Sequence, residues 1–301
     1  MPARQLITAL IAVGSAFGVP AGNPRPVRPP ILHRAPPARA IDFAVDTLLG
    51  ASGKLRARFL PVTQARELSR LLESLRVSDA EGGLLTRVAS MHVLPIVPFG
   101  FKVRGRVGSY RMGYWPGEPA SYISGAYDLP EGFIMVTPAN RDLRVSEHFR
   151  LRDFVTKDQA DVWPKYVVLR EVLLDKLELV IEQLRVDGHP VQGLKVMSGF
   201  RHPFYNMQGV GAGGRALDSR HIHGDAADVF VDDDGDGVMD DLDGDGRITV
   251  KDGDVIVAAV EQVERAYPWL TGGMGRYTET HAHGPFVHID VRGRPVRWGG
   301  A

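Results

Sequence analysis

Two short segments of the chain alternate apolar and polar residues with the period of a β-strand. In residues 226–231 (AADVFV), Asp228 stands between alanine and valine residues that would share the opposite face. In residues 286–291 (FVHIDV), His288 and Asp290 alternate with valine and isoleucine in the same way. Successive side chains of a strand point to opposite faces of its sheet. The pattern therefore predicts two strands that turn apolar side chains to one core and present Asp228, His288 and Asp290 away from it.

His221 lies seven residues before Asp228, in the segment SRHIHGDAADVFVD. Together with His288 these residues offer two imidazoles and one carboxylate, and such a set leaves the fourth position of a tetrahedral metal open. A catalytic zinc needs that open position, because it binds and acidifies a water molecule there. We therefore predict a zinc site at His221, Asp228 and His288. The competing interpretation is that a histidine in a strand is more often a hydrogen-bonded structural residue than a metal ligand.

Three motifs contain or adjoin these residues. The pattern H-x-x-G-x-A-x-D occupies 221–228, S-G-F-R precedes it at 198–201, and V-H-I-D follows at 287–290. In this order and spacing the motifs resemble those of the zinc D-Ala-D-Ala carboxypeptidases and murein endopeptidases, which share their fold with the hedgehog signalling domain. The resemblance extends over about residues 145–301 and includes the run SEHFRLRDF and a closing Arg-Trp pair.

The resemblance implies both a reaction and a set of residues. His221, Asp228 and His288 match the family's zinc ligands, and Arg201 matches an arginine that recognises or polarises the substrate. A guanidinium group suits this role because it can clamp a peptide carboxylate with two parallel hydrogen bonds. The alternative for Arg201 is a surface salt bridge. The expected activity is hydrolysis of an amide bond in a peptidoglycan stem peptide or cross-link, with carboxypeptidase and endopeptidase action both open.

The residue that would take a proton from the attacking water is not evident. Many members of the family have Glu or Asp three residues before the last zinc histidine, and this chain has Pro285 there. The candidates for the general base are Asp290 and His283, followed by Glu279. Asp290 has an alternative role, which is to orient a ligand imidazole. Without a base, the protein would be a non-catalytic module that keeps its metals and binds the cell wall.

Twelve aspartates crowd into residues 225–254, and part of this run follows the calcium-loop pattern. Alternating aspartates before a glycine are typical of a loop that wraps a Ca²⁺ ion. One frame uses Asp241, Asp243, Asp245, the Arg247 carbonyl and Asp252, and an overlapping frame uses Asp232, Asp234, Asp236 and again Asp243. Because the frames share an aspartate, two independent sites are not expected. We predict a calcium-binding insert at 232–252 that stabilises the preceding strand. The alternatives are a solvated acidic loop and a calcium-dependent structural protein of the cell surface.

The rest of the chain divides by composition. An arginine followed by an apolar run and small residues predicts a signal peptide, and a proline- and arginine-rich stretch after it predicts a linker. Leucines at helical spacing follow and predict a helical region, and the short valine-, tyrosine- and glycine-rich runs after them predict a β-rich region. Further on, a broad apolar stripe predicts a long helix over 164–185. The predicted parts are the signal peptide at 1–21, the linker at 22–40, a helical then β-rich region at 41–140, and a zinc peptidase domain at 141–301.

Composition narrows the class of protein. Lys+Arg and Asp+Glu are both 36, so the chain lacks the basic excess expected of a nucleic-acid-binding protein. It contains no cysteine, which excludes disulfides and thiolate metal sites. The N-terminal apolar run is short for a membrane span, so none is expected to remain after signal removal. The sequence thus predicts an exported α+β protein, periplasmic or secreted, in which a small antiparallel sheet carries the zinc site between flanking helices.

Overall fold

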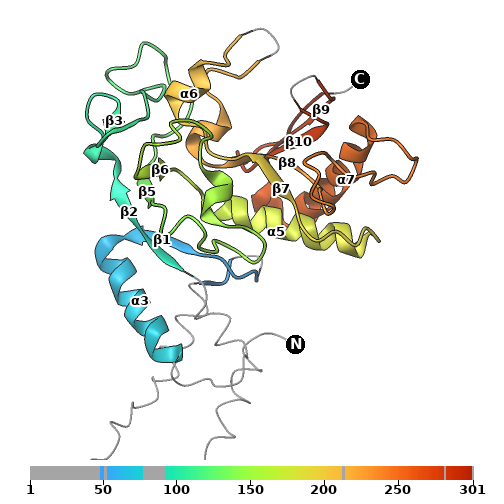
Figure 1. The fold of residues 1–301 in the computed structure, drawn as a ribbon, viewed down its shortest axis with the longest axis horizontal. Coiled ribbons are helices and arrows are strands. Elements are labelled where there is room, and N and C mark those ends of the chain that lie inside the picture. The colour runs from blue at the N-terminus through green and yellow to red at the C-terminus, as the bar shows by residue number, and fades with distance from the viewer. Residues whose placement is uncertain (1–47, 51–52, 77–91, 212–213, 281–282, 300–301) are drawn as a thin grey trace, which may run out of the picture. The chain divides into compact units, whose positions relative to one another are not determined.

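The computed structural model describes five segments of the chain, residues 48–50, 53–76, 92–211, 214–280 and 283–299. All five belong to one compact unit that spans residues 36–301. The predicted signal peptide at 1–21 and the linker at 22–40 lie outside the described residues. The described part combines small sheets with a few helices, so its class is α+β as predicted (Figure 1).

A five-stranded sheet carries the predicted metal ligands. Its strands, in spatial order, are β11 (Val296–Trp298), β9 (Gly273–Tyr277), β10 (Phe286–Asp290), β8 (Ala226–Phe230) and β7 (Lys195–Ser198). All neighbours are antiparallel except β11 and β9, which run parallel, so the prediction of a purely antiparallel sheet was wrong at this edge. In the pairing of β8 with β10, His288 lies opposite Asp228, and Val287 lies opposite Val229. This register confirms that the two polar side chains share one face of the sheet and the valines share the other.

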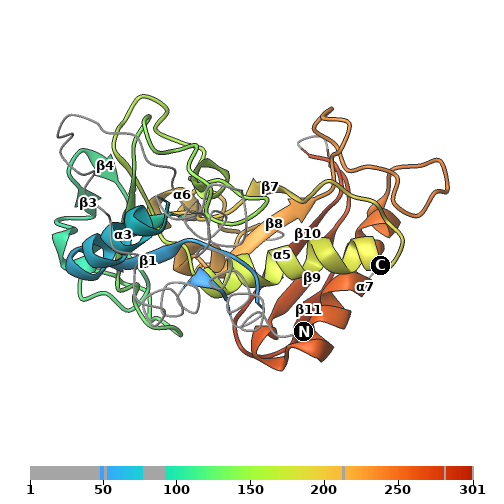
Figure 2. The same ribbon diagram turned by 90° about the horizontal axis from the view of Figure 1, so that it is seen from below.

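Helices α5 (Glu171–Val186) and α7 (Val250–Ala266) lie side by side against the apolar face of this sheet (Figure 2). Six apolar side chains of α5 at helical spacing are fully buried, namely Leu173, Leu174, Leu177, Val180, Ile181 and Leu184. Helix α7 begins at a capping box, in which Thr249 accepts a hydrogen bond from Lys251 N and Asp252 accepts one from Thr249 N at 2.7 Å. The helices therefore bury one face of the sheet, and the polar ligands project from the other.

The helix predicted over residues 164–185 begins later than expected. Residues Lys165–Val167 form strand β6, and α5 starts at Glu171 after the extended residue Arg170. Strand β6 pairs antiparallel with β5 (Gly132–Val136), a segment about thirty residues earlier. The prediction was wrong at this end because a short apolar run fits a buried strand as well as a helix, and only the distant pairing decides between them.

A second sheet lies in the N-terminal part of the described chain. Its strands, in order, are β1 (Arg58–Pro61), β2 (Val93–Pro98), β5 and β6, with β1 and β2 parallel and the other pairs antiparallel. Helix α3 (Val62–Arg76) follows β1, and strands β3 (Arg106–Val107) and β4 (Tyr110–Arg111) form a short hairpin. Because β5 and β6 both belong to this sheet, the sheet joins segments on both sides of residue 140.

One hydrophobic core joins the two sheets. The Trp115 ring packs against Phe133 of β5 and against Phe200, which follows β7, with centroids 5.8 Å and 6.4 Å apart. Trp115 Nε1 donates a hydrogen bond to Ile222 O at 2.7 Å. Trp115, which packs on the N-terminal sheet, therefore anchors the segment that carries His221.

Short helical turns complete the connections, namely η1 (Phe99–Phe101), η2 (Leu151–Phe154), α6 (Pro203–Met207), η3 (Arg220–His223) and η4 (Pro268–Leu270). Among the helices of the described residues, none has the length and apolar character needed to cross a membrane.

Candidate metal centre

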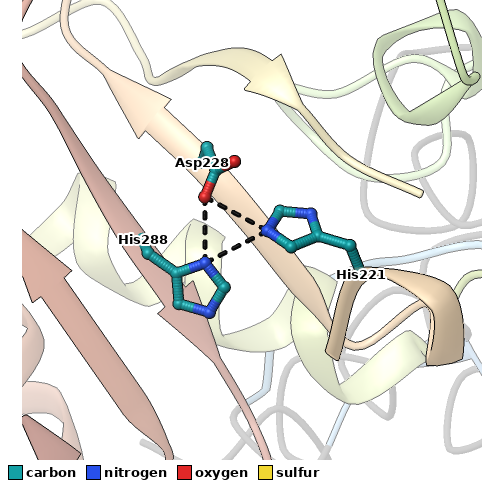
Figure 3. A group of neighbouring side chains, drawn as sticks. All are labelled: His221, Asp228 and His288. Carbon is teal, nitrogen blue, oxygen red and sulfur yellow. Dashed lines mark hydrogen bonds and ion pairs between the residues drawn. The ribbon is translucent and has the colours of Figure 1, made fainter. Parts of the chain in front are cut away.

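Three side chains from separate elements converge on the polar side of the five-stranded sheet (Figure 3). Asp228 projects from β8, His288 from β10 and His221 from η3. His221 Nε2 lies 3.1 Å from both Asp228 Oδ1 and His288 Nδ1, and the last two atoms lie 2.9 Å apart. All three residues are buried, with exposed fractions of 0% for His221 and 6% for the other two. The structure thus brings together the three residues predicted as zinc ligands.

Hydrogen bonds on the outer side of each imidazole determine which ring nitrogen carries a proton. His221 Nδ1 lies 2.7 Å from Gly199 O, and His288 Nε2 lies 3.1 Å from Asp290 Oδ2. Each of these acceptors requires an N–H, so in the neutral imidazoles His221 Nε2 and His288 Nδ1 carry lone pairs. Two imidazole lone pairs and a carboxylate oxygen then face one another. Such an arrangement is repulsive unless a cation or an extra proton lies among them.

The three donor atoms fit a zinc ion. Zinc bonds of about 2.0–2.1 Å in a tetrahedron place neighbouring ligand atoms roughly 3.3–3.4 Å apart. The observed separations are 2.9 Å and 3.1 Å, so the donors would need to spread by only roughly 0.3 Å. Two imidazole nitrogens and one carboxylate oxygen are also a donor set that catalytic zinc accepts.

Two of the three ligands have protonation states that suit metal binding. Burial lowers the pKa of His221 to about 4, so this imidazole is neutral at pH 7. Burial by itself would raise the pKa of Asp228, but charges and hydrogen bonds from His221 and His288 hold it well below its usual range. At neutral pH the site therefore contains a neutral imidazole and an ionised carboxylate, as metal ligation requires. Burial alone would lower the pKa of the third ligand, His288, but hydrogen bonds to Asp228 and Asp290 raise it, so a bound metal would have to displace a proton there.

Asp290 is fully buried behind the imidazole of His288. Its Oδ1 accepts from Gly273 N at 2.6 Å, and its Oδ2 accepts from Arg292 Nε at 2.9 Å as well as from His288. Burial would raise the pKa of Asp290, but the hydrogen bonds from His288 and Arg292 hold it far below its usual range. Both oxygens are thus occupied, on the side of His288 away from the other two ligands. Of the two roles considered for Asp290, this geometry favours orientation of the ligand imidazole over proton abstraction.

A cavity of about 920 Å³ opens beside the ligands. Its walls include Asp228, His288, Arg201, His283 and Trp298. Arg201 Nη2 lies 3.9 Å from Asp228 Oδ2, and Arg201 Nε forms no hydrogen bond within the described part of the chain. Burial lowers the pKa of Arg201, but an arginine remains protonated at neutral pH. The guanidinium group is therefore held next to the ligands with unused donors that can bind a carboxylate or a carbonyl.

The remaining candidates for the general base differ in position. His283 lines the cavity, and its Nδ1 lies 2.8 Å from Gly284 O. That contact places the ring proton on Nδ1 and leaves Nε2 as the basic nitrogen. Glu279 is exposed and does not line the cavity, and Pro285 is buried. His283 is thus the one of the three candidates for the general base that lines the cleft.

Other cleft residues received no role from the sequence. The indole of Trp298 packs against His288, with ring centroids 5.0 Å apart. Gly275 is needed beneath it, because a Cβ at this position would lie 2.2 Å from the indole ring. Arg292, which binds Asp290, also lines the cleft. Local sequence offers no signal for these roles, since Trp298 reaches the site only through the pairing of β11 with β9.

The acidic insert brings its carboxylates into two clusters. Three carboxylate oxygens lie within 4.8 Å of one another in each, from Asp232, Asp234 and Asp240 in the first and from Asp241, Asp243 and Asp252 in the second. The first cluster thus contains Asp240, which the motif did not include, and lacks the predicted Asp236 and Asp243. The two clusters share no residue, so the overlap that counted against two independent sites does not arise.

The aspartates of the insert differ in whether their carboxylate oxygens have hydrogen-bond partners. Asp232 Oδ1 is buried and forms no hydrogen bond with a described residue, while Asp232 Oδ2 contacts Lys195 Nζ. An unpaired buried carboxylate oxygen is costly, and a cation beside it would offset that cost. Asp245 is outside the second cluster and instead accepts a hydrogen bond from Arg247 N at 2.9 Å. The oxygen-only donor sets suit calcium.

Comparison with known proteins yields no match to a family model, a curated protein or a solved structure. Three convergent donors, an adjacent arginine and an open cleft together make a candidate zinc centre.

Proposed function

We propose that the chain is a zinc-dependent peptidase that hydrolyses peptidoglycan stem peptides or cross-links. One observation carries the proposal: two imidazole lone pairs and a carboxylate oxygen converge at the wall of a cavity of about 920 Å³. Donors held in fixed tautomers next to open space are expected of a metal that must also reach a substrate. The choice of peptidoglycan rests on predicted export and on the resemblance of 198–201, 221–228 and 287–290 to the D-Ala-D-Ala carboxypeptidases and murein endopeptidases.

Each residue of the site has a separate role in the proposed amide hydrolysis. Zinc, when bound, supplies a Lewis acid that polarises the scissile carbonyl and acidifies water. Arg201 lines the cleft beside Asp228 and binds the carboxylate or carbonyl of the substrate through its guanidinium group. His283 accepts the proton of the attacking water at Nε2, since its Nδ1 is engaged by Gly284 O. Asp290 holds His288 in the tautomer that binds metal.

The acidic insert has a structural role in the proposal, with one Ca²⁺ ion at each cluster. Strand β8, which carries Asp228, ends at Phe230, and the first cluster begins at Asp232. Asp252 of the second cluster belongs to the capping box of α7. Ions bound to both clusters would therefore stabilise the connection from the zinc-binding strand to the helix that packs beneath it.

Digestion of purified muropeptides by the zinc-loaded protein tests the proposal. Product masses should reveal cleavage of one type of amide bond and thereby distinguish carboxypeptidase from endopeptidase action. His288→Ala should abolish zinc binding and cleavage, because two ligands hold an open site poorly. His189→Ala removes a histidine that does not line the cleft and should leave both intact. Folded, zinc-loaded protein that cleaves no muropeptide would instead indicate the non-catalytic, wall-binding module.

A further inference from the structure

Tyr277 lies on the same face of the five-stranded sheet as the metal ligands, and the chemistry described so far gives it no role. In the pairing of β9 with β10, Tyr277 stands opposite Phe286 and Gly275 stands opposite His288. Residues opposite each other in an antiparallel pair share one face of the sheet, and so do alternate residues of one strand. The side chain of Tyr277 therefore projects from the face that carries His288, and it lines the metal cleft.

The hydroxyl of Tyr277 is oriented by the tryptophan that packs on His288. Trp298 Nε1 donates a hydrogen bond to Tyr277 Oη at 2.9 Å. The pairing of β11 with β9 sets Trp298 beside Gly275, and its indole lies against the His288 ring, with centroids 5.0 Å apart. A single indole thus contacts a metal ligand with its ring and binds the tyrosine hydroxyl through its nitrogen.

Aromatic contacts fix the ring of Tyr277 from its other side and lead to the proposed base. Tyr277 stacks on Phe286, with centroids 4.4 Å apart and the ring planes 7° from parallel. Phe286 in turn packs against the imidazole of His283, with centroids 4.9 Å apart. The metal ligand His288 and the base candidate His283, which must act at one scissile bond, therefore flank Tyr277 through Trp298 and Phe286.

The Tyr277 hydroxyl has a proton left to donate. A phenol group is both a hydrogen-bond donor and an acceptor. The oxygen of Tyr277 accepts from Trp298, and no residue in the described part of the chain accepts its proton. Tyr205 also lines the cleft, but no hydrogen bond with a described residue orients its hydroxyl. Tyr277 thus presents an oriented donor that a ligand in the cleft can use.

We propose that Tyr277 donates a hydrogen bond to the oxyanion that forms from the scissile carbonyl, an inference that rests on the proposed peptidase function. When water adds to the carbonyl carbon, its proton passes to His283 Nε2, and the π-electron pair of the carbonyl moves onto the carbonyl oxygen. Tyr277 keeps its own proton and shares it with that oxygen only through the hydrogen bond. Because this bond is stronger with the oxyanion than with the neutral carbonyl, it lowers the barrier to the addition.

The phosphinate analogue of D-Ala-D-Ala tests this role, because its tetrahedral, negatively charged group replaces the scissile amide and mimics the oxyanion. Calorimetry with the zinc-loaded protein measures Kd for the phosphinate, and D-Ala-D-Ala is followed through KM where it is cleaved and through Kd where it is not. Tyr277→Phe should weaken phosphinate binding about 10- to 100-fold, the loss expected for one hydrogen bond to a charged group. It should lower kcat on muropeptides by a similar factor, and leave zinc affinity, KM and the binding of D-Ala-D-Ala within about threefold of the wild type.

The matched control is Tyr267→Phe, since Tyr267 packs against Trp269 outside the cleft, with ring centroids 5.3 Å apart, and should leave every one of these quantities unchanged. Unaltered phosphinate binding in the Tyr277 variant would overturn the inference. Equal losses for the phosphinate and for D-Ala-D-Ala would also overturn it, as would a wild type that does not prefer the phosphinate. A phosphinate preference that depends on Tyr277, in a protein that cleaves no muropeptide, would support the donor and count against the peptidase function, so the two failures are distinguishable.

Discussion

Replacing Asp290 with asparagine tests how the zinc site is held together. Asp290 accepts a hydrogen bond from His288 Nε2 at 3.1 Å, and this bond leaves the lone pair on Nδ1, which faces the other two ligands. Asparagine has one carbonyl oxygen, for which Gly273 N and Arg292 would compete. An amide NH₂ turned toward His288 Nε2 would favour the opposite tautomer, with its proton in the metal position. The substitution should therefore weaken zinc binding.

The sizes of the changes in zinc affinity and in turnover distinguish the two roles considered for Asp290. Loss of the hydrogen-bond partner of a ligand histidine costs about 10- to 100-fold in metal affinity, or roughly 1.4–2.8 kcal/mol. Loss of a general base costs about 10²- to 10⁴-fold in rate and leaves the metal bound. We expect the first outcome, with turnover at saturating zinc within about tenfold of the wild type, because Asp290 has no free oxygen and lies behind His288.

Zinc affinity is measured by competition with a chelator, and turnover is measured on muropeptides at saturating zinc. Asp225→Asn is the control, since Asp225 is also fully buried and paired with an arginine but contacts none of the three ligands. An Asp290→Asn variant with unchanged zinc affinity and turnover reduced 10²- to 10⁴-fold would refute the argument and make Asp290 the base.

Three further outcomes follow from the packing and the charges. Gly275→Ala should push Trp298 off His288 and lower the stability by about 1–3 kcal/mol, and an unaltered melting temperature would contradict this. Burial raises the pKa of Asp175 to about 6, so the folded state binds this proton more tightly than the unfolded chain. The free energy of unfolding should therefore fall by up to ~2–3 kcal/mol as pH rises from about 4 to 6, and Asp175→Asn should lack this part of the slope in urea titrations. Calorimetry should find two Ca²⁺ ions per chain and a higher melting temperature with calcium, and Asp232→Asn and Asp241→Asn should each remove one ion. A single ion in the wild type would contradict the two-cluster arrangement.

Local alternation was sufficient to assign Asp228 and His288 to the polar faces of two strands. The direction of a side chain in a strand depends only on whether its position is odd or even, and the sequence contains that information. Alternation could not place the two residues opposite each other. Their register depends on the pairing of β8 with β10, segments 60 residues apart, and on the core that α5 and α7 form beneath them.

The sequence prediction was wrong or left alternatives open where a segment was compatible with more than one local conformation. The apolar run 166–169 suits a helix or a buried strand, and the pairing of β6 with β5 made its first part a strand. In the acidic insert, the motif specifies only the spacing of aspartates along the sequence. It does not specify the three-dimensional path of the loop, which decides which carboxylates come together. The structure therefore places Asp240 in the first cluster, whereas the motif predicted Asp236 and Asp243 there.

The sequence by itself determined the chemical groups available to the site: two imidazoles and a carboxylate on strand-like or adjacent segments, with an arginine nearby. Tertiary structure alone decided which nitrogen of each imidazole faces the metal position and which role the geometry favours for Asp290. The physical reason is that the place of the ring proton depends on the outer hydrogen-bond acceptor. For His221 that acceptor is Gly199 O, which comes from a turn 22 residues away in the chain.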